Sequence, residues 1–157
     1  MKGLTLIRPW DFAMLHGKDV ENRKWAPWPE AIGQRIALHA GSKYDAHAET
    51  FIRARGVDLP DQSLSIPGQI VGVTTVAGWV SKDAEGSGLF GFLYGGNITS
   101  DEAQAALESR WFMGPFGWVV RDTVALATPV ACKGALGLWR LPLAVEALVN
   151  AQIARAA

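Results

Sequence analysis

The sequence predicts a single mixed α+β domain whose sheet is mostly antiparallel or curved. The chain has 157 residues, which leaves room for one compact core. Segments with the periodicity of strands alternate along the chain with segments that have the periodicity of helices. Apolar residues make up 49% and charged residues 19% of the sequence, so the composition is that of a folded globular domain and excludes wholesale disorder or a coiled coil.

The first half of the chain predicts strands and helices in alternation. Residues 4–7 form a short β-rich run, and residues 10–16 follow with helical spacing until Gly17 ends the helix. Residues 18–25 should be extended or looped, because the Ala-Pro-Trp-Pro sequence behind them excludes regular helix. Residues 35–40 alternate as a half-buried strand, and a capping box at Ser42 and Asp45 opens a helix that ends at Gly56.

The second half predicts a long strand, a loop, a helix, two strands and a final helix. Residues 68–80 are rich in Val and Thr, and residues 82–97 are rich in turn-forming residues. A capping box at Thr99 and Glu102 opens a helix that extends to about residue 110. Strands over 118–120 and 124–131 flank a turn at 121–122. Pro142 starts the last helix, with an apolar face formed by Val145, Leu148, Val149 and Ile153.

Charge and cysteine content limit the classes of partner and compartment. Fifteen Lys and Arg balance fifteen Asp and Glu, so no global positive field attracts the chain to nucleic acid or membrane, and any such binding must be local. The one cysteine, Cys132, cannot form an intrachain disulfide and is expected to be a small buried hydrophobe. Because no signal peptide or membrane span is recognised, we expect a cytoplasmic protein with no membrane partner.

Charged side chains are concentrated in residues 17–25, Gly-Lys-Asp-Val-Glu-Asn-Arg-Lys-Trp. Lys18 and Glu21 are three residues apart and could form an ion pair on one surface, while Arg23 adds a planar donor for phosphate or a base edge. Spacing alone leaves two interpretations open, because such a run can serve a functional site or can be a solvated turn.

Aromatic and histidine side chains give further candidates. Most of the seven tryptophans should lie in the core, but Trp25 and Trp28 lie beside charges and prolines, where an exposed indole could stack on a base or pack over the sheet. His39 shares a strand face with Arg35 and could line a cleft or form a structural hydrogen bond. The histidines are too scattered for a metal site, and no serine elbow or phosphate-binding loop occurs.

Several segments together resemble the ASCH family (activating signal cointegrator homology) of the PUA-like superfamily. They are the Leu-Thr-Leu-Ile-Arg-Pro-Trp start at residues 4–10, the Gly-Lys-x-x-Glu-x-Arg stretch at 17–23, the strand at 36–40 and the Gly-Leu-Trp sequence at 137–139. The resemblance spans most of the chain. It implies a PUA-like small mixed β-barrel closed by short helices, with an extra C-terminal helix and an insertion atypical of the family at residues 82–110.

The resemblance also implies a function and a site. ASCH domains are widely proposed to bind RNA or modified nucleobases, so the implied partner is single-stranded RNA or a modified nucleoside, with no cofactor and no metal. The cleft group becomes Lys18, Glu21 and Arg23, with Trp10 near its wall; Lys24, Trp25 and His39 are further binding candidates. The sequence does not predict the oligomeric state.

The alternative function is a metal-independent hydrolase. Some small ASCH proteins deacylate N4-acetylcytidine with a lysine that is followed three residues later by a threonine, and others have been suggested to cleave RNA. Here Lys18 fits that pattern, but Glu21 stands where the threonine would be, so the same chemistry would need Lys18 and Glu21 to act on water. Whether the chain is an enzyme is therefore left open.

Overall fold

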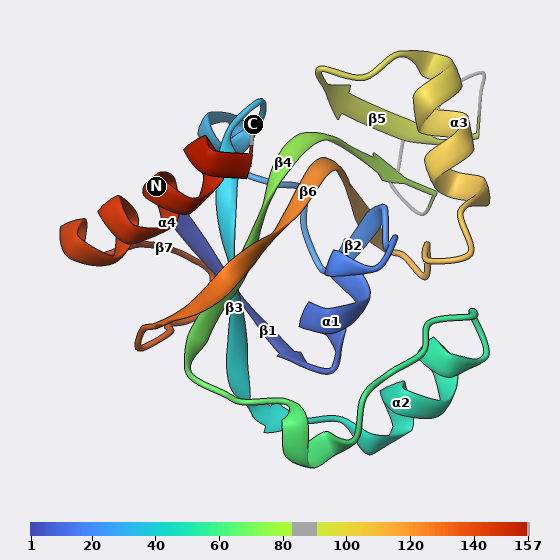
Figure 1. Ribbon diagram of the computed structural model, residues 1–157. Coiled ribbons are helices and arrows are strands. Elements are labelled where there is room, and N and C mark those ends of the chain that lie inside the picture. The colour runs from blue at the N-terminus through green and yellow to red at the C-terminus, as the bar shows by residue number, and fades with distance from the viewer. Residues whose placement is uncertain (83–90, 157) are drawn as a thin grey trace. The chain divides into compact units, whose positions relative to one another are not determined.

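A computed structural model describes residues 1–82 and 91–156 (Figure 1). The chain divides into two compact units, each built from segments that are distant in the sequence. The first unit contains Met1–Gly17, Ile36–Thr74 and the described residues from Thr123 onward, and the second contains Lys18–Arg35 and the described residues between Thr75 and Asp122.

The strands form a mixed sheet, with hydrogen-bonded order β2-β6-β4-β3-β1-β7 and β5 paired with β4. Within it β1 runs parallel to β3 and antiparallel to β7, and β2 runs antiparallel to β6. The mixed sheet with its helices confirms the predicted α+β class. The strands are β1 (Lys2–Arg8), β2 (Val20–Arg23), β3 (Arg35–Tyr44), β4 (Gln69–Ser81), β5 (Leu93–Gly96), β6 (Phe116–Ala131) and β7 (Leu138–Arg140).

The α-helices of the described residues begin and end largely where the sequence predicts. Both predicted hydrogen bonds of the Thr99 capping box are present, between the hydroxyl and the Glu102 N–H and between the Glu102 carboxylate and the Thr99 N–H. The capping box predicted at Ser42 is wrong, because Asp45 itself caps the helix by accepting from two backbone N–H groups. The helices are α1 (Trp10–Leu15), α2 (Ala46–Arg53), α3 (Ser100–Glu108) and α4 (Leu143–Ala156).

The core of the first unit lies between strands β3, β4 and β6 and the final helix. Val149 of α4 is fully buried and packs with Ile70 and Val73 of β4, and Gln152 binds both the N–H and the carbonyl of Thr128 on β6. The predicted extra C-terminal helix is therefore present and docked. The prediction of Leu148 as part of its buried face is wrong, since this side chain is 57% exposed.

Two further predictions about the second half of the chain need correction. Residues 116–131 form one continuous strand, β6, and not two strands around a turn; Asp122 takes the left-handed conformation (φ 53°) inside it. The predicted loop over residues 82–97 contains the short strand β5, which pairs with the end of β4. Residues 83–90 of that loop lie outside the described residues.

Two glycines of β4 occur where neighbouring atoms leave no room for a side chain. A Cβ at Gly72 would lie 2.7 Å from the Val124 carbonyl oxygen, and a Cβ at Gly78 would lie 2.4 Å from the Gly95 carbonyl oxygen. These glycines therefore permit close packing against the chain beside the strand. Within the described residues, no helix has both the length and the apolar character that crossing a membrane requires.

Candidate functional site

Strand β2 fixes the charged motif within the second unit. Its backbone pairs with β6 so that Glu21 lies opposite Trp118 and Arg23 opposite Phe116. The Asn22 side chain adds two bonds to the segment before β6, donating to the Trp111 carbonyl and accepting from the Met113 N–H. The motif is therefore extended, as predicted, and is held by hydrogen bonds to β6 and to the segment before it.

Lys18 and Glu21 form a buried ion pair. The exposed fraction is 2% for Lys18 and 7% for Glu21, which excludes the solvated-turn interpretation for these two residues. The Lys18 ammonium group donates to the Glu21 carboxylate and, over 2.7 Å, to the Val20 carbonyl. On its other oxygen Glu21 meets the Arg23 guanidinium at 2.9 Å. One carboxylate thus lies between two cations.

Burial changes the protonation equilibrium of Lys18. Desolvation lowers the pKa of the Lys18 ammonium below its usual range, and the neighbouring Glu21 carboxylate opposes this effect. A buried lysine whose pKa is lowered loses its proton more readily and then becomes a base or a nucleophile. The site can therefore either hold a structural charge pair or supply an amine for catalysis.

Arg23, Lys24 and Trp25 lead from this ion pair to the protein surface. Arg23 lies over the Trp118 ring, with 5.8 Å between its Cζ and the ring centroid. Trp118 donates from its indole nitrogen to the Trp25 carbonyl over 2.9 Å, which fixes the backbone at Trp25. The Trp25 side chain itself is 49% exposed, and Lys24 beside it is also exposed. A half-exposed indole therefore directly follows two cationic residues in the sequence.

Two predicted site residues belong to the first unit and not to the second. Trp10 opens α1 and packs edge-on against Phe51 at 5.7 Å between ring centroids. His39 on β3 is buried and its Nε2–H donates to the Cys132 carbonyl over 2.9 Å. Its Nδ1 has no hydrogen-bond partner among the described residues, and Gly134 passes so close that a Cβ there would lie 2.5 Å from it. The predicted structural hydrogen bond of His39 is thus present.

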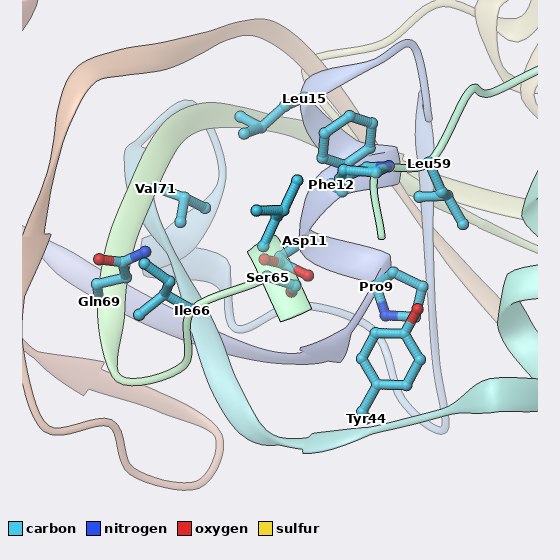
Figure 2. Close-up of a pocket in the computed structure, with 12 residues that line it drawn as sticks. Pro9, Asp11, Phe12, Leu15, Tyr44, Leu59, Ser65, Ile66, Gln69 and Val71 are labelled. Carbon is cyan, nitrogen blue, oxygen red and sulfur yellow. The ribbon is translucent and has the colours of Figure 1, made fainter. Parts of the chain in front are cut away.

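The structure adds Asp11, a candidate that the sequence reasoning missed. Asp11 lies in the first turn of α1, is 6% exposed, and lines a cavity of about 150 Å³ in the first unit. Its Oδ1 has no hydrogen-bond partner among the described residues. Figure 2 shows Asp11 with the apolar side chains of Phe12 and Val71 and with polar Ser65, which lines the same cavity. Burial raises the pKa of Asp11 to about 6, against smaller opposing effects of the Phe12 N–H and Arg8.

Arg8 holds the wall of the Asp11 cavity in place. Its guanidinium donates to the carbonyls of Gly41, Ser42 and Ser65, and it lies 5.7 Å from the Tyr44 ring centroid. Because an aspartate in the first turn of a helix is favourable for the helix alone, its sequence position did not mark Asp11 as functional. The available signal was its place between Trp10 and Phe12, on a helix that is otherwise apolar.

Metal ligation has no support among the residues that the structure describes. Within them, no group of three or more His, Cys, Asp or Glu side chains is placed to hold a metal ion.

Comparisons with known proteins found similarity at the level of solved structures. No family model and no curated protein matches the chain. The chain is similar to the crystal structure of ASCH from Zymomonas mobilis, with a TM-score of 0.49 and 14% identity over 96% of this chain and 93% of that one. It is similar in the same degree to a tyrosine-to-phenylalanine mutant of that protein, with a TM-score of 0.49 and 14% identity over 95% of this chain and 96% of that one. These neighbours in structure are ASCH proteins.

Proposed function

We propose that this chain binds single-stranded RNA or a modified nucleoside, and that Arg23, Lys24 and Trp25 form the contact surface. The observation that supports the proposal best is the half-exposed Trp25 indole beside two cationic side chains. Bases stack on exposed aromatic rings with little sequence preference, while Lys and Arg meet phosphates. The residues from 18 to 25 carry three cations and two carboxylates, so the local charge is weakly positive.

The buried ion pair of Lys18 and Glu21 orients Arg23, one residue of the proposed contact surface. Glu21 binds Arg23 from the interior, so the guanidinium is held in one orientation before any ligand arrives. A preorganised side chain loses less conformational entropy on binding than a mobile one. In this proposal Lys18 and Glu21 act as positioning residues, and Arg23, Lys24 and Trp25 touch the nucleic acid. The predicted binding roles of Trp10 and His39 stay predictions.

The proposal is tested by titrating a short labelled single-stranded RNA at two salt concentrations. Replacement Trp25→Ala should weaken binding by about fivefold or more, because stacking of one base contributes about 1–3 kcal/mol. Replacement Lys24→Ala should also make binding less sensitive to salt, with a slope of log K against log salt that is smaller by about 0.7 per lost phosphate contact. Lys43→Ala, an exposed lysine of the first unit, is the matched control. No binding by the wild type, or equal binding by all variants, would overturn the proposal.

A second candidate function is a metal-independent hydrolase acting on an N4-acylcytidine-type amide or on RNA. The observation that favours it is the lowered pKa of the Lys18 amine in direct contact with the Glu21 carboxylate. A neutral amine could take a proton from water, and the carboxylate could orient the amine.

Turnover distinguishes the hydrolase from the binding domain. The wild type and Glu21→Gln are incubated with N4-acetylcytidine and with the same RNA, and the products are separated by chromatography. Product from the wild type that is lost in Glu21→Gln, with retained folding by circular dichroism, supports the hydrolase. Binding of RNA without any product from either substrate eliminates it.

A further inference from the structure

The cavity around Asp11 has the features of a ligand site. Its walls come from α1, the end of β3, the segment before β4 and the first residues of β4, all within the first unit (Figure 2). Aromatic rings of Phe12 and Tyr44 and aliphatic side chains such as Leu59 and Val71 provide most of its lining. Small-molecule sites typically combine such apolar walls with a few fixed polar groups.

One carboxylate oxygen of Asp11 accepts no hydrogen bond from the described residues. The residue is 6% exposed, yet Oδ1 is buried without a hydrogen-bond partner among the described residues. Buried polar atoms in folded proteins are nearly always bonded, so an unpaired carboxylate oxygen on a residue that lines a cavity indicates a donor supplied from outside. The raised pKa of Asp11 agrees with this, since desolvation of the carboxylate outweighs its backbone hydrogen bonds and the attraction of Arg8.

The charges around the cavity define the class of donor. Among the described residues, no Lys, Arg or His side chain lines it, so a phosphate or carboxylate ligand would find no counter-charge. Arg8 is close enough to influence Asp11, but its guanidinium is bonded to three backbone carbonyls and does not line the cavity. The tyrosine hydroxyl is also engaged, as Tyr44 donates to Glu49 over 3.0 Å. The described lining therefore offers an anion and aromatic rings without a competing cation.

We propose that the Asp11 cavity binds a small organic cation of the aralkylamine class, whose ammonium group donates to Asp11 Oδ1. The apolar body of the ligand packs between the rings of Phe12 and Tyr44 and the aliphatic wall. Aromatic faces attract cations, and a charge-assisted hydrogen bond to a buried carboxylate is among the stronger contacts that a protein can offer a small ligand. This site lies outside the Arg23–Trp25 surface and goes beyond RNA binding.

The test uses a matched pair of probes, benzylamine and benzyl alcohol, which share an aromatic body and differ in charge. Binding is measured by saturation-transfer NMR and calorimetry at pH 7.5. Benzylamine should bind at least about tenfold more tightly than benzyl alcohol, because the alcohol forms a neutral hydrogen bond in place of a charged one. Asp11→Asn should remove this preference, whereas Asp58→Asn, at an exposed carboxylate of the same unit, should keep it.

A second variant guards against misfolding as the cause of lost binding. Val71→Phe keeps Asp11 but fills the cavity, so it should weaken both probes together while the far-ultraviolet circular dichroism spectrum stays that of the wild type. Equal affinity of the two probes for the wild type overturns the proposal, as does benzylamine binding that survives both Asp11→Asn and Val71→Phe. Because the RNA titration depends on other residues, either proposal can fail while the other stands.

Discussion

Buried charges stand in different surroundings in the two units of the chain. In the second unit, Lys18 and Glu21 are buried together, and Arg23 binds the remaining carboxylate oxygen. In the first unit, the Asp11 carboxylate is buried beside apolar side chains, with one oxygen unpaired among the described residues. The comparison shows two ways in which a fold can bury a charge. A buried charge with an ion-pair partner contributes to the stability of the fold. A buried charge without a partner destabilises the folded state until a ligand or a proton binds to it.

The largest effect should come from breaking the paired group. Lys18→Met should lower the free energy of unfolding by about 3 kcal/mol, the lower end of the range for a broken buried ion pair, because Glu21 keeps its bond to Arg23. Urea denaturation followed by tryptophan fluorescence measures the loss. The exposed neighbour gives the control, since Lys24→Met should change stability by no more than about 0.5 kcal/mol. A Lys18→Met protein as stable as the wild type would show that the pair is not a framework element.

Asp11, whose Oδ1 is unpaired among the described residues, should lower the stability of the folded state when it is ionised. Burial raises the pKa of Asp11 from 3.8 to about 6, so between these values the folded state holds a proton that the unfolded state has lost. The contribution of Asp11 to stability is therefore unfavourable above pH 6. It improves as the pH falls through 6 and is fully recovered below 3.8.

Asp11→Asn removes this titration and should stabilise the protein at pH 8 by as much as about 3 kcal/mol, the equivalent of a shift of two pKa units. The comparison is made by thermal unfolding of both proteins at a series of pH values from 4 to 8. Arg8 on β1, which acts on the Asp11 carboxyl, and Tyr44 on β3, which lines the same cavity, are unchanged in the variant. An unchanged pH dependence in Asp11→Asn would contradict the assignment.

A smaller loss of stability is expected when a hydrogen-bonded side chain at the surface, Thr99, is replaced. Thr99 accepts from the Glu102 N–H at the start of α3 and completes a capping box there. Thr99→Ala should cost about 1 kcal/mol, the usual loss for an N-cap residue. Chemical denaturation of this variant beside Thr99→Ser, which keeps the hydroxyl, provides the measurement. A loss from Thr99→Ser as large as that from Thr99→Ala would mean that the hydroxyl is not what matters.

The sequence predicted contacts better than it predicted burial. The three-residue spacing of Lys18 and Glu21 indicated their ion pair, and the periodicity located most helices and strands. Burial of the pair could not be predicted, because it depends on the pairing of β2 with β6, which lies far along the chain from it. Leu148 fits the helical period of α4 but is exposed. Periodicity shows which residues lie on one side of a helix, but it does not show how wide a strip of that side is packed against the core.

Asp11 shows the same limit at a candidate site. A carboxylate in the first turn of a helix is common and usually faces water, so its pattern indicates a helix start and nothing more. Its significance comes from Tyr44 and Leu59, which close the cavity from segments far away in the sequence. Likewise Asp122 was predicted as a turn residue from its local sequence, and it does take a left-handed conformation, but strand β6 continues through it.

Arg8 holds the backbone of the Asp11 cavity wall through hydrogen bonds that do not involve the side chains lining the cavity. The guanidinium joins the end of β3 to the segment that precedes β4 through three carbonyl oxygens, which every amino acid possesses whatever its side chain. The side chains on that wall can consequently be exchanged without loosening the backbone that carries them. A lineage that kept Arg8 could alter which molecule fits the cavity in single steps, and a designer could change its selectivity through Ile66 or Leu59 while the framework remains intact.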